Sequence, residues 1–309
     1  MPTIDGRTRH YGTFYGLPAD DPSSDPAGPV VLVHGNCQAE AIRVLLSTAP
    51  ELAGRTVRMP PVFELTTEDL PHLDRLLARC DLLISQPVAD DYRDLPLGAA
   101  QLAARLPATA RVIRWPVLYF GGFHPWQVTV RDPRDPSRNP PVVPYHDLRT
   151  LAAAADRPVT DAAYDLDALR SLAGASLAEL VRREQRDCDV GVSDVLTAPE
   201  VGDMMTINHP GNRLLIELAR RLQAAAGSSV TAADPGRALL GEVVAPVRPE
   251  ALAALGVTGD PVPRWTVGGA VVEPELVHQV QGQWYRDNPW VLAAGLERHR
   301  DALALLGWG

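Results

Sequence analysis

The chain has 309 residues, of which 46% are hydrophobic and 22% are charged, and its formal net charge is −9. This length is sufficient to bury a large hydrophobic core, and the composition excludes wholesale disorder. The acidic balance argues against a dedicated binder of nucleic acid or of an anionic membrane, and no apolar run reaches the length that spans a bilayer.

The N-terminal residues 1–28 are polar and rich in proline and aspartate, and they predict an irregular lead-in with turns over residues 20–29. The segment lacks the apolar core of a signal peptide, so we expect a cytoplasmic protein without membrane insertion. The three cysteines (Cys37, Cys80 and Cys188) are odd in number and far apart, which favours neither a disulfide framework nor a zinc site. We therefore expect no metal.

The following part of the chain alternates predicted strands with predicted helices. Val30–Val33 is a short β-branched run, and after a tight turn residues 39–46 carry apolar side chains at helical spacing. Further elements are expected as a helix that Thr66 to Asp69 caps and that runs through Leu77, a strand over 82–84, a helix over 97–106 and a strand over 111–115. This order predicts an α/β fold with a parallel, Rossmann-like sheet flanked by helices, whose ligands bind at the carboxyl ends of the strands.

The second half of the chain contains fewer strand signals. Residues 131–145 are rich in proline, arginine and aspartate and predict a long loop, whereas residues 171–188 and the stretch after Asn212 predict helices. Beyond residue 230, helical stretches are expected over 273–280 and 289–306. The predicted organisation is thus an N-terminal lead-in (1–28), an α/β catalytic domain (29–230) and a mostly helical C-terminal extension packed on it (231–309).

Cys37 is the most informative position for function. It follows the first predicted strand and begins the first predicted helix, where backbone N–H groups and the helix dipole are expected to lower the thiol pKa. Gly35 permits the tight turn, and Asn36 and Gln38 provide amide donors beside the sulfur. A thiol flanked by such donors is suited to form an acyl thioester and to stabilise its oxyanion.

His209 is the expected partner of this thiol, because it lies in a loop directly before an amphipathic helix and is suited to act as a base. The arrangement resembles the SGNH/GDSL hydrolases, whose nucleophile turn follows the first strand and whose base lies in a late Asp-x-x-His block. Here a cysteine replaces the nucleophilic serine, and Thr206 replaces the aspartate that orients the base. Asp203 is a candidate substitute for that aspartate.

The ordered motifs more closely resemble the WcbI-like family of polysaccharide-biosynthesis acyltransferases. The resemblance covers roughly residues 30–225, and its blocks are Gly35-Asn36-Cys37-Gln38, Ser85-Gln86-Pro87 with Asp91-Tyr92, Tyr119 to Pro125, and Asn208-His209-Pro210. It implies an enzyme that binds coenzyme A and transfers an acetyl group to a sugar hydroxyl of a capsular polysaccharide.

Several further residues are candidates for the same site. Ser85 and Gln86 end the second predicted strand and are expected to face the Cys37 turn, where Gln86 is placed to donate to an oxyanion. Tyr119 and His124 belong to an aromatic, glycine-rich loop, and His124 is a candidate acid, base or phosphate contact. Because the chain contains no lysine, arginine must supply any positive charge for the phosphates of coenzyme A. The candidates are Arg114, Arg131 and Arg134.

The leading hypothesis is a coenzyme-A-dependent acyltransferase centred on Cys37 and His209, with a glycan or a small natural product as acceptor. Acyl transfer through Cys37 and direct transfer that needs only His209 both remain open. One alternative is a cysteine-dependent esterase or thioesterase of SGNH type, and a second is a non-catalytic binding protein. The C-terminal extension is expected to shape acceptor choice or to form a homo-oligomer.

Overall fold

The computed structural model describes residues 5–17, 28, 30–159 and 165–309. The chain forms two compact units, each built from three separate stretches of sequence. Unit 1 comprises Met1–Leu118, Leu180–Thr197 and Asn212–Leu239, and unit 2 comprises Tyr119–Glu179, Ala198–Gly211 and Leu240–Gly309. This division corrects the expected contiguous domains, because residues 119–179 pack with the C-terminal part of the chain rather than with the parallel sheet.

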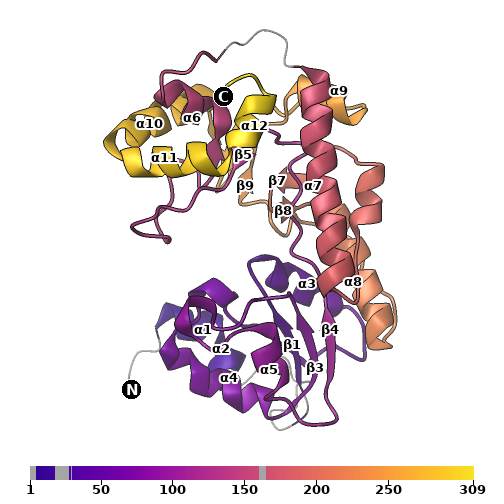
Figure 1. Ribbon diagram of the computed structural model, residues 1–309. Helices are drawn as coiled ribbons and strands as arrows, with labels where there is room; N and C mark the ends of the chain where they lie inside the picture. The colour runs from indigo at the N-terminus through magenta and orange to yellow at the C-terminus, as the bar shows by residue number, and fades with distance from the viewer. Residues whose placement is uncertain (1–4, 18–27, 29, 160–164) are drawn as a thin grey trace. The chain divides into compact units, whose positions relative to one another are not determined.

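Unit 1 contains a four-stranded parallel sheet with the strand order β2-β1-β3-β4 (Figure 1). The strands are β1 (Val30–His34), β2 (Thr56–Val57), β3 (Cys80–Ser85) and β4 (Arg111–Arg114). All five residues of β1 are buried, as expected for a central strand covered on both faces. The predicted α/β fold with a parallel sheet is confirmed, and β2 is the additional strand.

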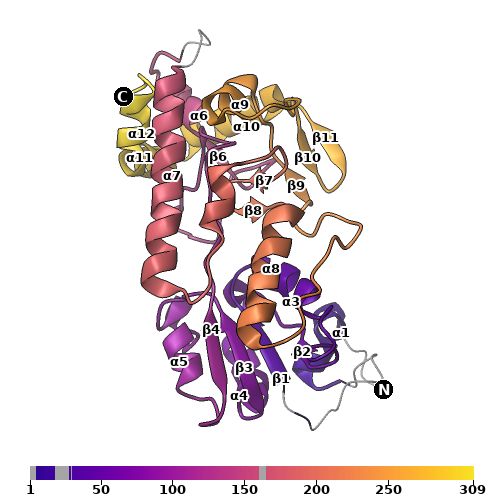
Figure 2. The same cartoon turned by 90° about the vertical axis from the view of Figure 1, so that its right-hand side faces the viewer.

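Helices cover the sheet of unit 1 because alternate strand residues point to opposite faces. Val30 and Leu83 contribute to a hydrophobic cluster with residues of helices α2 (Gly12–Tyr15), α4 (Leu70–Leu77) and α5 (Ala99–Ala103). The helices α3 (Gln38–Leu46) and α8 (Asn212–Ala226) pack against each other, and they also contact β1 and β4, respectively (Figure 2).

The N-terminal part of unit 1 is more ordered than the sequence suggests. Helices α1 (Gly6–His10) and α2 replace the expected irregular segment, and the Phe14 side chain is fully buried. The predicted turns over residues 20–29 lie outside the described residues, except for position 28. The predicted cap at Thr66 is confirmed, because its backbone N–H donates to the Asp69 carboxylate at 2.9 Å and closes a capping box.

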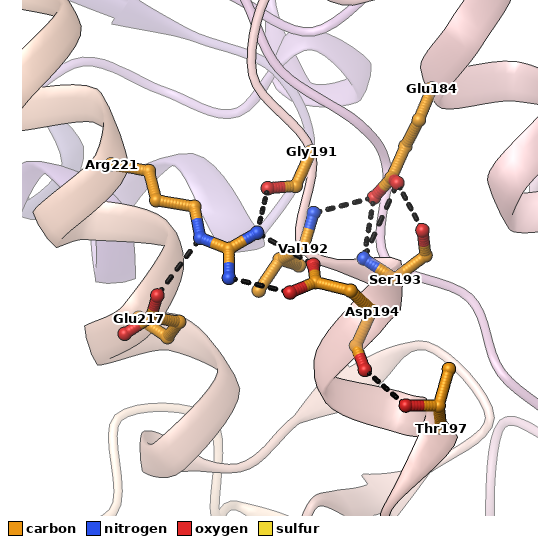
Figure 3. Close-up of polar contacts among 8 residues, drawn as sticks. All are labelled: Glu184, Gly191, Val192, Ser193, Asp194, Thr197, Glu217 and Arg221. Carbon is orange, nitrogen blue, oxygen red and sulfur yellow. Dashed lines mark hydrogen bonds and ion pairs between the residues drawn. The ribbon is translucent and has the colours of Figure 1, made fainter.

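Polar side chains fix the stretch 180–197 within unit 1 (Figure 3). The Glu184 carboxylate accepts the backbone N–H groups of Val192 at 2.8 Å and Ser193 at 3.1 Å. Asp194 forms an ion pair with Arg221 of α8, with a closest distance of 2.6 Å. These contacts attach the end of helix α7 (Leu166–Asp187) and the 3₁₀ helix η4 (Ser193–Thr197) to α8.

Unit 2 is mostly helical and contains only short antiparallel strands. Its helices include α6 (Leu148–Ala154), α9 (Pro249–Leu255), α10 (Pro274–Asp287), α11 (Pro289–Arg298) and α12 (Arg300–Leu305). The strand pairs are β5 (Gln127–Val128) with β6 (His146–Asp147), and β7 (Met204–Thr206) with β8 (His209–Pro210). A three-stranded sheet joins β9 (Val243–Val244), β10 (Trp265–Val267) and β11 (Ala270–Val272).

The core of unit 2 joins side chains that are distant in sequence. Trp126, Leu148 and Leu151 pack with Tyr285 and Val291 in one buried cluster. The helical character of the C-terminal region is confirmed, but the single helix expected over 289–306 is two helices that meet at His299. In the described part of the chain, no helix combines the length and apolar character needed to cross a membrane.

Candidate active site

The predicted nucleophile turn lies at the topological switch point of the sheet in unit 1. In the order β2-β1-β3-β4 the chain goes from β1 to β2 on one side and from β3 to β4 on the other side, and ligands of such sheets bind outside the carboxyl ends of these two adjacent strands, β1 and β3. Strand β1 ends at His34, directly before Gly35, and β3 ends at Ser85, directly before Gln86. The fold therefore brings these two sequence blocks together at one edge.

The Gln86 side chain holds the turn that follows β1. Its Oε1 accepts the backbone N–H of Asn36 at 2.8 Å, and its Nε2 donates to Oε1 of Gln38 at 3.2 Å. Gly35 passes so close to this amide that a Cβ atom there would lie 2.7 Å from Cδ of Gln86. The glycine is required for this close approach, and Gln86 fixes the shape of the turn.

Gln38 connects the turn to the chain after β4. Its side chain is fully buried, with Nε2 donating to the Leu118 carbonyl at 2.8 Å and Oε1 accepting the Leu118 N–H at 3.0 Å. Both amides thus hold the backbone of the turn, and because each Nε2 carries two N–H groups, the roles of Gln38 and Gln86 as oxyanion donors stay predictions. Neither residue type nor spacing indicates the partner Leu118, which lies 80 residues away.

Ser85 is also a structural residue. It is fully buried, and its hydroxyl donates to the Gln86 carbonyl at 2.7 Å and lies 2.9 Å from Nδ1 of His34. Because the serine proton is used by the carbonyl, His34 must donate to the serine oxygen through Nδ1. Burial lowers the pKa of His34 to about 4, so the ring is neutral at physiological pH. Ser85 therefore bonds to its own neighbours in this structure, and a contact between Ser85 and a ligand at the Cys37 turn stays a prediction.

Cys37 is the N-cap residue of α3 and its side chain is partly exposed. Burial raises the pKa of its thiol to about 11, although hydrogen bonds from the backbone N–H groups of Cys37 and Gln38 act in the opposite direction. The expected donors are thus present, but the expected lowering of the pKa is not, because desolvation of the thiolate outweighs them. In this structure Cys37 is a neutral thiol at physiological pH.

Asn36 retains the predicted capacity to bind a ligand. Its Oδ1 accepts the backbone N–H of Gln38 at 2.9 Å, which orients the amide beside Cys37. No hydrogen bond joins its Nδ2 to another residue among those that the structure describes, and the side chain is partly exposed. The Nδ2 group of Asn36 is therefore available to donate a hydrogen bond to an incoming oxyanion.

His209 lies in unit 2, at the start of the short strand β8. Its backbone N–H donates to Thr206 Oγ1 at 3.1 Å. The Tyr145 hydroxyl donates to Asn208 Oδ1 at 2.8 Å and lies 2.8 Å from Thr206 Oγ1, and the Tyr145 ring is perpendicular to the His209 ring at 6.3 Å between centroids. Asn208 and Tyr145 thus fix the loop that presents His209.

The electrostatic surroundings of His209 suit a base. Burial lowers the pKa of its imidazole, and the charge of Glu242 partly opposes this effect, so the ring is neutral at physiological pH. Thr206 holds the backbone of His209 rather than its ring. The Asp203 carboxylate accepts the backbone N–H of Glu200 at 2.8 Å, so it stabilises a turn. Because Cys37 and His209 belong to different units, their pairing stays a prediction.

The aromatic, glycine-rich loop is packed inside unit 2. Tyr119 is partly buried against a hydrophobic cluster that includes Ile207. His124 is only 1% exposed, and its ring nitrogens lie 3.1 Å from the Pro246 carbonyl and 3.2 Å from the Met204 carbonyl. Burial lowers its pKa to about 4. In this structure His124 holds backbone carbonyls together, and its role as an acid, base or phosphate contact stays a prediction.

The three arginines proposed for coenzyme A occupy different surroundings. Arg114 ends β4 and is held by Asp189 through its backbone N–H at 2.8 Å and its guanidinium at 3.2 Å. Arg134 places its guanidinium 3.6 Å from the ring centroid of Trp290, and Arg131 is exposed in the same loop. Arg114 belongs to unit 1 and the other two belong to unit 2, so a shared phosphate site stays a prediction.

Metal chemistry has no obvious location in the described ranges. There, no group of three or more histidine, cysteine, aspartate or glutamate side chains is arranged to hold an ion.

Comparisons with known proteins agree with this fold and with the ordered motifs. The sequence profile of the family described as polysaccharide biosynthesis enzyme WcbI matches residues 30–231. A solved structure of WcbI, described as a novel polysaccharide biosynthesis enzyme, superposes with a TM-score of 0.74 at 21% sequence identity, over 91% of this chain and 99% of that chain. No curated protein is detectably similar to the chain. The family match covers more than half of the residues, and the chain therefore belongs to the WcbI family of polysaccharide biosynthesis enzymes.

Proposed function

We propose that the protein is an acyltransferase that takes an acyl group, expected to be acetyl, from a coenzyme A thioester and transfers it to a hydroxyl of a glycan or natural-product acceptor. The observation that supports this most directly is the position of Cys37. Its thiol lies at the N-terminus of α3 and at the switch point of the sheet, with backbone N–H groups directed at the sulfur. The solved WcbI structure is described as a native protein without a disulfide bond between coenzyme A and a cysteine, which is consistent with a thiol beside that molecule.

Two routes for the acyl group are compatible with these residues. In the first, the Cys37 sulfur attacks the thioester carbonyl carbon, the bond from that carbon to the sulfur of coenzyme A breaks, and the leaving thiolate takes the proton that Cys37 loses. The acceptor hydroxyl then attacks the acyl-cysteine, and Cys37 leaves as a thiol. In the second, the hydroxyl attacks the thioester carbonyl carbon directly, the bond from that carbon to the sulfur of coenzyme A breaks, and the leaving thiolate receives the proton that the hydroxyl loses. In both routes Asn36 Nδ2 is proposed to donate to the oxyanion and His209 to take the hydroxyl proton.

The raised pKa of Cys37 bears on the choice between these routes. With a pKa of about 11, only about one thiol in ten thousand is ionised at pH 7, so the covalent route requires a base or a bound donor that shifts this equilibrium. The direct route has no such requirement, because the burial that lowers the pKa of His209 keeps its imidazole neutral, and a neutral imidazole can accept a proton without prior ionisation of a thiol.

Intact-mass measurement after incubation with acetyl-CoA tests the proposal. The proteins compared are the wild type, Cys37→Ala and Cys188→Ala, the last replacing another partly exposed thiol of unit 1. One added acetyl group in the wild type and in Cys188→Ala, but not in Cys37→Ala, establishes the covalent route. Binding of coenzyme A without an adduct, together with transfer that Cys37→Ala retains and His209→Gln loses, establishes the direct route. Absence of both adduct and binding refutes the coenzyme A donor and favours a hydrolase.

A further inference from the structure

Unit 2 contains a cavity that the chemistry above does not use. Its volume is about 680 Å³, within the range of about 300–1,000 Å³ that small-molecule sites occupy. Strands β5 and β6, the segment 246–250, the segment 261–265 and helix α10 form its walls. All of its lining residues belong to unit 2, so the cavity is complete within that unit.

Two ion pairs hold polar groups rigidly in the wall. Arg149 is bound to Asp147 through Nε at 3.0 Å and Nη2 at 2.7 Å, and Arg248 is bound to Glu250 through Nε at 3.3 Å. Both guanidinium groups also lie against Trp126, at 5.3 Å and 5.7 Å from its ring centroid. The wall therefore offers both hydrogen-bond donors and acceptors, and neither arginine is an uncompensated positive charge.

The charge of the cavity opposes an anionic ligand. The lining carries the carboxylates of Asp147, Glu250 and Glu275 against the guanidinium groups of Arg149 and Arg248. The lining histidines add no charge at neutral pH, because burial lowers the pKa values of all three: His124, His146 and His278. A phosphate or carboxylate would enter a site that is already net negative, whereas a neutral ligand with many hydroxyl groups would find both donors and acceptors.

Aromatic rings provide the apolar part of the lining. Tyr145 and Trp265 are stacked with an interplanar angle of 19° and a centroid separation of 6.1 Å, and both line the cavity. A pyranose ring has one face of C–H groups, which packs on an aromatic face, and a rim of hydroxyl groups, which requires charged or amide partners. The combination in this cavity fits that ligand.

The same residues connect the cavity to the loop of His209. Tyr145 lines the cavity with its ring, and its hydroxyl donates to Asn208, the neighbour of His209. His124, also in the wall, approaches the carbonyl of Met204 in β7, the strand that pairs with the strand of His209. We propose that this cavity binds a neutral sugar residue of the acceptor and thereby positions the glycan relative to His209. This inference rests on the proposed acyl transfer for its functional meaning, but not for the binding itself.

Ligand-observed NMR with methyl glycosides of glucose, mannose and galactose at millimolar concentration tests the binding. The key variant is Arg248→Met, and the matched control is Arg264→Met, which also loses an arginine–glutamate pair, here with Glu273, but lies outside the cavity lining. We expect at least one glycoside to bind the wild type and the control equally, and to lose about tenfold or more in affinity in Arg248→Met, as for a charged hydrogen bond. Glu250→Gln, which keeps the size of the side chain, is expected to weaken binding as well.

The remaining outcomes separate this inference from the proposed function. If no glycoside binds, or if both arginine variants bind it equally, the sugar site is refuted even when acetyl-CoA acylates the protein. If adenosine 3′,5′-bisphosphate binds and loses affinity only in Arg248→Met, the cavity is a nucleotide site and the inference is overturned. If a glycoside binds as expected but acetyl-CoA neither binds nor acylates, the sugar site stands and the proposed transfer fails.

Discussion

Replacement of Gln38 by leucine tests whether this residue holds the nucleophile turn or acts on the ligand. Leucine has nearly the same volume as glutamine, so the change removes the amide without opening a cavity. In the structure the amide satisfies both the N–H and the C=O of Leu118, whose own exposure is 1%. Gln38→Leu leaves these two backbone groups buried without their partner, and it also removes the oxygen that accepts from Gln86 Nε2 at 3.2 Å.

The expected cost is about 3 kcal/mol of unfolding free energy. It follows from about 1–3 kcal/mol for each of the two unsatisfied backbone groups, partly offset by the gain from burying an apolar side chain. Urea unfolding followed by circular dichroism measures it, and hydrogen exchange of residues 30–46 shows whether the loss includes α3. Gln185→Leu, an exposed glutamine of α7 in unit 1, is the control and is expected to change stability by less than about 0.5 kcal/mol.

The result that would refute this reasoning is a Gln38→Leu protein with wild-type stability and wild-type exchange in α3 that no longer transfers the acyl group. That outcome would assign Gln38 the role of an oxyanion donor. Equal loss of stability in both glutamine variants would show that the added leucine, rather than the lost amide, is responsible.

Three further predictions concern the same turn and the buried histidines. Gly35→Ala should destabilise unit 1 by about 1–3 kcal/mol, because the new Cβ overlaps the Gln86 amide, and unchanged thermal unfolding would contradict this. Alkylation of Cys37 by iodoacetamide at pH 8 should be about a hundredfold slower than that of a thiol with the ordinary pKa of 9.0, since its own pKa is about 11, and an equal rate would show that the thiol is not desolvated. The pKa values of His124 and His146 are lowered to about 4, so the unfolded chain binds protons below pH about 6.5 while the folded chain does not. The free energy of unfolding should therefore fall between pH 7 and pH 5, and a flat profile would be inconsistent with neutral buried rings.

The sequence predicts the sheet of unit 1 well because its signals are local. The β-branched run at Val30, the glycine turn and the amphipathic helix each lie within a short window, and together they place Cys37 at a strand end. No local pattern predicts strand β2 (Thr56–Val57), because two residues carry no periodicity and the strand exists only by pairing with β1. The short strands of the β10–β11 hairpin are not predicted from the sequence for a similar reason.

The roles of individual side chains were harder to predict than their positions. Gln38, Gln86 and His124 all occur in the expected blocks, yet each is engaged by backbone groups that become neighbours only in the folded chain. The pKa of Cys37 likewise depends on burial in the folded chain, and no local sequence pattern predicts that burial. Tyr145, which fixes the loop of His209, follows a long proline-rich loop and gave no signal in the sequence.

The division into units has a consequence for how the protein can be made and dissected. The chain passes between the two units five times, so neither unit is a continuous stretch that a ribosome completes first. When Leu118 has been synthesised, the sheet is present, but α3 still lacks α8, and the carbonyls of Ala225 and Ala226 that receive Arg111 at the sheet edge have not been made. Fragments cut at any one position are therefore expected to aggregate. A designer who wishes to exchange the cavity of unit 2 for another must replace parts of two separate segments, one within residues 119–179 and one within residues 240–309.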